Sequence, residues 1–187
     1  MSEDRTKLWS LKRSIAVGAI GFGLVSLFVF ATVAYGERRM YQNLGMLGAY
    51  LTWTVTFIVL SAAVFGTLVV GRWRLPKFYL LFSFAFFAYA VAWMIAYYNS
   101  PNTAGEVIGS LAGSVLMALV FALAFESIES TVKLSAVLFV SNFLGYFIGS
   151  ALNNSLHGQI GMLLWGVVYG LFFGAGIGAA LHLVQRR

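Results

Sequence analysis

Residues 160–184, IGMLLWGVVYGLFFGAGIGAALHLV, contain no Asp, Glu, Lys or Arg in 25 positions. An α-helix rises about 1.5 Å per residue, so about 20 apolar residues cross a hydrocarbon core of about 30 Å. This stretch therefore predicts a transmembrane helix. Five more runs of similar length also lack these charges, at residues 14–34, 47–70, 78–98, 107–125 and 134–152.

The composition of the whole chain indicates the same class of protein. Of the 187 residues, 60% are hydrophobic and only 10% are charged, whereas a soluble domain carries about 25% charged residues. We therefore predict an all-α integral membrane protein, with residues 1–187 forming one polytopic domain, a bundle of six transmembrane helices. The chain has no cysteine, which excludes disulfides and thiolate metal sites.

The basic residues predict an orientation. If the six runs alternate across the membrane, ten of the twelve Lys and Arg lie on one side and only Arg38 and Arg39 on the other. An excess of Lys and Arg marks the cytoplasmic side, so both termini are expected inside, in a prokaryotic cytoplasmic membrane. The ten are Arg5, Lys7, Lys12, Arg13, Arg72, Arg74, Lys77, Lys133, Arg186 and Arg187.

An internal similarity accompanies the six runs. A shift of 91 residues aligns residues 18–38 with residues 109–129, so that Gly18 coincides with Gly109 and Phe30 with Phe121. A repeat of three helices plus three would place the halves in opposite orientations, as in many transporters. A chance match between segments built from few residue types is the alternative.

Small residues recur at every fourth position in several runs. In lipid, helices associate through close backbone approach, which small side chains allow. We therefore interpret these small-xxx-small ridges chiefly as helix-packing seams, with a pore wall or sliding surface as the alternative. The glycines concerned are Gly166, Gly170, Gly174 and Gly178 in the last run, Gly145 and Gly149 in the fifth, and Gly109 and Gly113 in the fourth.

A polar line follows one face of the run at residues 134–152. Asn142, Tyr146, Ser150 and Asn154 are spaced by four, and Asn153 lies at the same end. Residues four apart share a helix face, and unpaired amides are costly in lipid, so this face is expected to point into the bundle. It predicts either a solute site open to the outside or hydrogen bonds between helices, for example to Thr52, Thr54 or Thr56.

Charged and histidine side chains supply few other candidates. Arg38, Arg39 and His157 are the positive groups expected at the outer surface, where paired arginines hold a carboxylate or phosphate or contact lipid headgroups. Glu106 follows Thr103 by three, which predicts a capping box.

Aromatic residues crowd the run at residues 78–98, which holds ten of them, and we expect them to face lipid rather than a planar ligand. The stripe includes Phe82, Phe86, Tyr89, Trp93 and Tyr97.

The usual signatures of catalysis do not occur in the sequence. It contains no HExxH, no GxSxG and no nucleotide-binding loop, and His157 and His182 are too far apart to share a metal ion. We therefore expect no enzyme activity, no metal and no cofactor. A lipid-acting function would need a hydrophilic groove, which only the line at Asn142 offers.

Two functions fit these features. The first is solute handling, as a channel, a facilitator or the membrane-embedded binding subunit of a larger importer. In size, helix number and expected topology the chain resembles the substrate-binding components of energy-coupling factor vitamin importers, which implies an outward pocket closed by the segment around Arg38. The second is a structural or assembly subunit with lipids, other membrane subunits or a second copy as partners. In that case Gly166, Gly170, Gly174 and Gly178 would be exposed.

Overall fold

The computed structural model describes residues 8–71 and 76–186, and these residues are helical with short connections and no strand. Five of the helices are long and apolar enough to cross a membrane. The predicted all-α class is therefore confirmed, and the five apolar helices indicate a multi-pass membrane protein. The helices are α1 (Leu11–Gly66), α2 (Lys77–Asn99), α3 (Thr103–Ala124), α4 (Thr131–Leu156) and α5 (Gly158–Gln185), with the 3-10 turn η2 (Ile128–Ser130) before α4.

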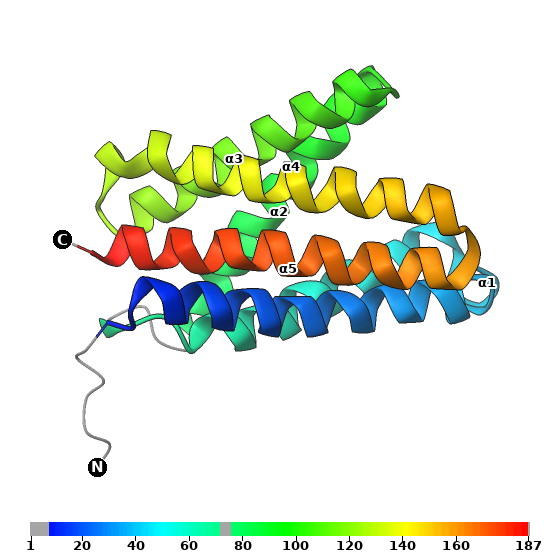
Figure 1. Cartoon of the computed structure of the whole chain (residues 1–187), viewed down its shortest axis with the longest axis horizontal. Helices are drawn as coiled ribbons and strands as arrows, with labels where there is room; N and C mark the ends of the chain where they lie inside the picture. The colour runs from blue at the N-terminus through cyan, green and yellow to red at the C-terminus, as the bar shows by residue number, and fades with distance from the viewer. Residues whose placement is uncertain (1–7, 72–75, 187) are drawn as a thin grey trace, which may run out of the picture.

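The longest helix, α1, bends back on itself at Gly45. Within α1, all of which is described, Gly45 alone has non-helical angles, φ 68° and ψ 174°, a conformation open essentially to glycine. Figure 1 shows the chain reversing at this end of the bundle, so that the second half of α1 returns beside the first. Residues 35–44, expected as a loop, continue the first half as helix.

Neither the predicted count of six separate helices nor the internal repeat is confirmed. The run at residues 14–34 and most of the run at 47–70 belong to one bent element, so the described residues form five long α-helices where the sequence predicts six. The sequence predicted a loop between these two runs, whereas helix continues beyond the first run and the chain reverses at Gly45, eleven residues after Ala34.

The two ends of the described chain lie at the same end of the bundle, which we call the terminal end (Figure 1). The reversal of α1 and the turn between α4 and α5 lie at the opposite end (Figure 1). The excess of Lys and Arg predicts that the terminal end is cytoplasmic. Of the ten basic residues behind that prediction, five lie outside the described residues, namely Arg5, Lys7, Arg72, Arg74 and Arg187.

Buried phenylalanines fill the terminal half of the bundle. Phe22 is in edge contact with Phe173, and their ring centroids are 5.9 Å apart. Phe65 and Phe82 are 5.4 Å apart by the same measure. All four side chains have 0% exposure. In lipid such packing stabilises through dispersion, since the surrounding hydrocarbon is itself apolar.

The glycines of α5 lie against the first half of α1. A Cβ atom on Gly174 would overlap the carbonyl oxygen of Gly18, and one on Gly178 would overlap the carbonyl oxygen of Ser14. A Cβ on Gly170 would lie 2.6 Å from the Cβ of Ser26. Gly166, Gly170, Gly174 and Gly178 are all buried in this contact, so the ridge is covered by the chain's own first helix.

Candidate functional site

A cavity of about 240 Å³ lies between α1, α2, α4 and α5, in the half of the bundle farther from the termini. Its volume is slightly below the roughly 300–1,000 Å³ of sites for drug-sized ligands. At about 30 Å³ per water molecule, it corresponds to about eight waters, or to a compound with a single ring. The lining residues are Phe30, Tyr89, Ala90, Trp93, Met94, Tyr146, Trp165 and Tyr169.

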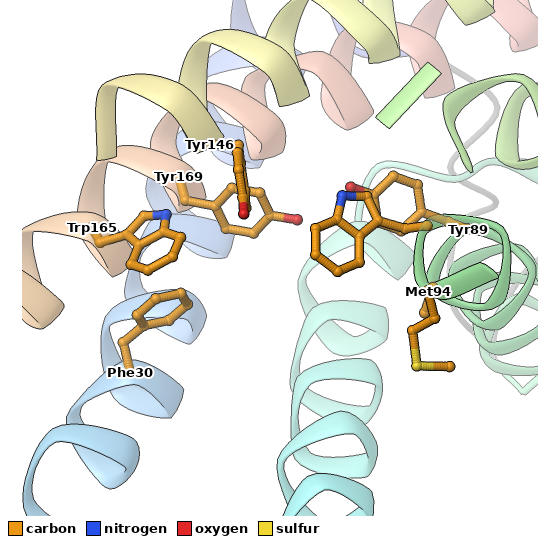
Figure 2. Close-up of a pocket in the computed structure, with 8 residues that line it drawn as sticks. Phe30, Tyr89, Met94, Tyr146, Trp165 and Tyr169 are labelled. Carbon is orange, nitrogen blue, oxygen red and sulfur yellow. The ribbon is translucent and has the colours of Figure 1, made fainter. Parts of the chain in front are cut away.

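Aromatic rings from four helices form the wall. Figure 2 shows Phe30 and Trp165 on one side, Tyr89 and Met94 on the other, and Tyr146 and Tyr169 between them. The ring of Trp165 lies 5.8 Å from that of Phe30 and 5.6 Å from that of Tyr146, centroid to centroid. These separations are within the range of favourable aromatic pairs, so the rings form one continuous surface.

Glycines on neighbouring helices make room for four of these side chains. A Cβ on Gly113 of α3 would lie 2.6 Å from the ring of Tyr89, and one on Gly149 of α4 would overlap the ring of Trp165. Both glycines were predicted to be packing residues, and both also position the rings of the cavity. The other two pairs are Gly109 with Trp93 and Gly166 with Phe30.

Two hydrogen bonds fix tyrosines of the wall. The Tyr89 hydroxyl donates to Oδ1 of Asn142 at 2.8 Å, joining α2 to α4. The Tyr146 hydroxyl donates to Oε1 of Glu106 at 2.9 Å, joining α4 to α3. Asn142 is fully buried, and its Nδ2 has no hydrogen-bond partner among the described residues. One amide with unpaired donors and one carboxylate thus lie behind the wall, each bonded to a tyrosine that lines the cavity.

The predicted polar line on α4 reaches the cavity only in part. Tyr146 lines it and Asn142 is bonded to Tyr89, which also lines it. Ser150 and Asn153 are half-buried, Asn154 is exposed, and all three lie farther toward the opposite end. The partner of Asn142 is Tyr89 on α2 and not a threonine of residues 52–56.

The predicted positive groups stay outside the cavity. Arg38, Arg39 and His157 are exposed at the opposite end, and none lines it. Residues 35–45 are all described, and none of them contributes to the lining. The segment around Arg38 therefore does not close this cavity.

The role expected for Glu106 is corrected by the structure. Asn102, not Thr103, caps α3, because its Oδ1 accepts hydrogen bonds from the backbone N–H groups of Ala104 and Gly105. Glu106 does not form a capping box with Thr103, and its carboxylate accepts the Tyr146 hydroxyl instead. The hydrogen bond to Tyr146 on α4, and not a local cap of α3, therefore accounts for the position of the Glu106 carboxylate.

The aromatic stripe of α2 is also placed differently from the expectation. Phe82, Phe86 and Tyr89 are buried, and Trp93 and Tyr97 are half-buried, so the stripe faces the bundle and not lipid. The spacing of three and four residues between these aromatic side chains places them on one helix face, and this was the sequence signal that could have predicted a buried stripe. Phe30, Trp165 and Tyr169 were missed altogether, since nothing local distinguishes them from other apolar positions.

Among residues 8–71 and 76–186, no three His, Asp or Glu side chains come together to hold a metal ion. His182 contacts the chain instead, with its Nδ1 2.9 Å from the carbonyl oxygen of Trp9.

No protein-family model, no curated protein and no solved structure matches this chain. Its function must therefore be inferred from the chemistry of the cavity.

Proposed function

We propose that this protein binds a small solute within the membrane, in the aromatic cavity, as the binding component of a transport system. The observation that carries the proposal is the wall of six rings, Phe30, Tyr89, Trp93, Tyr146, Trp165 and Tyr169, around a cavity of about 240 Å³. Small-molecule sites have this composition, with mostly apolar and aromatic walls and a few convergent polar groups.

The proposal includes six membrane crossings. Each half of α1 accounts for one, and α2, α3, α4 and α5 account for the other four. Gly45 reverses the chain within α1, and the two ends of the described chain lie at one end of the bundle (Figure 1). With the terminal end in the cytoplasm, as the excess of Lys and Arg predicts, the cavity lies in the outer half of the membrane. A solute then enters it from outside.

A binding protein is favoured over an open channel by the packing of the terminal half. Phe22, Phe82 and Phe173 are fully buried there, and the ring of Phe173 lies 5.4 Å from that of Tyr89, a cavity residue. The core therefore begins directly beneath the cavity. Passage of a solute would require these rings to move.

The alternative function, a structural or assembly subunit, depended on an exposed glycine ridge on α5. It requires the glycine ridge of α5 to be free for another subunit, whereas Gly170, Gly174 and Gly178 are buried against α1. A role as a binding component is compatible with partner subunits that dock elsewhere.

Ligand-induced stabilisation of the purified protein tests the proposal. In nanodiscs, a panel of single-ring compounds of different charge should contain at least one class that raises the melting temperature. At a ligand concentration of 100 times Kd, stabilisation is about 2.7 kcal/mol. Ala90→Phe, which adds a ring inside the cavity, should abolish the shift.

Leu80→Phe is the matched control, because Leu80 is on the same helix but is 76% exposed. It should bind like the unmodified protein. A panel that never shifts the melting temperature, or a shift that persists in Ala90→Phe, would refute binding in this cavity.

A further inference from the structure

The geometry points to one class of solute for the cavity, an organic cation with an aromatic or alkyl body. This inference rests on the proposed function. Benzyltrimethylammonium represents this class. Three features favour positive charge, namely the ring faces of the wall, the hydroxyl groups of Tyr89 and Tyr146, and the carboxylate of Glu106, which lies behind the wall and is bonded to Tyr146.

The rings are the first feature. Aromatic faces carry a negative quadrupole, and a cation within about 6 Å of a ring centroid is attracted to it, most strongly to tryptophan and more so when water is excluded. Trp93 and Trp165 line the cavity together with three tyrosines and Phe30. The ring of Tyr146 lies 6.0 Å from that of Trp93 and 5.6 Å from that of Trp165, centroid to centroid. A small cation in the cavity is therefore near several rings at once.

The hydroxyl groups are the second feature. A tyrosine hydroxyl has one proton to donate and keeps lone pairs as acceptors. Tyr89 donates its proton to Asn142, and Tyr146 donates its proton to Glu106. Both protons are therefore held by protein acceptors, so these two hydroxyls have no proton left to donate to an anion in the cavity.

The distribution of charge is the third feature. Glu106 is tied directly to a lining residue by its 2.9 Å hydrogen bond with Tyr146. No Lys or Arg among the described residues lines the cavity, and Arg38 and Arg39 are exposed at the end of the bundle. In a membrane interior, where charges are poorly screened, this imbalance attracts a cation.

Some groups of the site favour a neutral solute instead. Trp93 and Trp165 each carry an indole N–H donor, and Nδ2 of Asn142 has no partner among the described residues. A neutral acceptor would use these donors. A neutral molecule of the same shape is therefore the decisive comparison.

The experiment compares three ligands on the whole protein in nanodiscs of zwitterionic lipid. Benzyltrimethylammonium is the cation, neopentylbenzene is its neutral isostere, and benzenesulfonate is the anion. Binding is followed by tryptophan fluorescence, with protein-free nanodiscs correcting for partition into lipid. We expect the cation to bind at least about tenfold more tightly than the isostere, and the anion to bind least.

The charge of Glu106 is tested separately with Glu106→Gln. The glutamine keeps the size and the oxygen that accepts from Tyr146, so only the charge is lost. We expect cation affinity to fall about tenfold while affinity for neopentylbenzene is unchanged, which also shows that the variant is folded. Glu37→Gln is the matched control, because Glu37 accepts a similar 2.9 Å hydrogen bond from a tyrosine, Tyr41, but Tyr41, unlike Tyr146, does not line the cavity.

The outcomes separate this inference from the proposed function. If the isostere binds as tightly as the cation, or Glu106→Gln weakens both equally, selection of a cation is refuted while solute binding stands. If none of the three ligands binds and the wider panel in the Ala90→Phe experiment also fails, the proposed function falls as well. Equal losses in Glu37→Gln and Glu106→Gln would assign the effect to surface charge and overturn the role of Glu106.

Discussion

The hydroxyl of Tyr146 donates a hydrogen bond to Oε1 of Glu106, with 2.9 Å between the two oxygens. The two residues are 40 positions apart and belong to different helices, α4 and α3. The contact fixes a carboxylate next to the wall of the cavity, although neither residue has a local sequence partner that would reveal the pairing.

Removing this hydroxyl should destabilise the protein. Tyr146→Phe leaves a half-buried carboxylate without its donor, and hydrogen bonds to charged groups contribute about 1.5–3 kcal/mol. We expect a loss of that order in thermal or chemical unfolding in detergent. Tyr98→Phe is the control, since Tyr98 is 78% exposed. A double-mutant cycle with Glu106→Gln should show coupling, and strictly additive losses would contradict the pairing.

The bond between Tyr89 and Asn142 predicts a compensating pair of variants. Asn142→Leu leaves the buried Tyr89 hydroxyl without an acceptor, at a cost of about 1–3 kcal/mol. Adding Tyr89→Phe removes the orphaned hydroxyl, and replacing both partners by apolar groups is nearly neutral. The double variant should therefore unfold at a higher temperature than Asn142→Leu alone. A double variant that is less stable than both single variants would show that the pair does not act as a unit.

How much could be predicted from the sequence differs between the fold and the site. Charge-free runs of about 20 residues identify membrane helices from local composition alone, so the helical class was accessible. Position along the α4 face likewise predicted that Asn142 and Tyr146 point inward. The cavity itself depends on which helices become neighbours, and Phe30 and Trp165 are 135 residues apart in the chain. Their pairing at 5.8 Å follows from the packing of α1 on α5, which no local pattern specifies.

The glycine contacts between α1 and α5 predict a sharp contrast between two substitutions. Gly174→Ala places a methyl group against the backbone carbonyl of Gly18, so the helices must separate, and we expect a loss of about 1–3 kcal/mol, typical of overpacking. Gly36→Ala meets no atom within 4 Å and should be neutral or stabilising by up to about 1 kcal/mol, since alanine favours the helix. Unfolding in detergent measures both. Equal effects would mean that close approach of the backbones is unimportant.

The six crossings of the proposed topology can be tested with single cysteines, because the natural chain has none. If each half of α1 crosses the membrane, Gln42→Cys, near the Gly45 bend, and Gln159→Cys, at the start of α5, face the same side. Both should react with an impermeant maleimide added to intact cells. Glu129→Cys, in the turn before α4, should react only after the membrane is opened, because it lies at the terminal end. If α1 instead left the membrane without crossing twice, Glu129→Cys and Gln42→Cys would label from the same side.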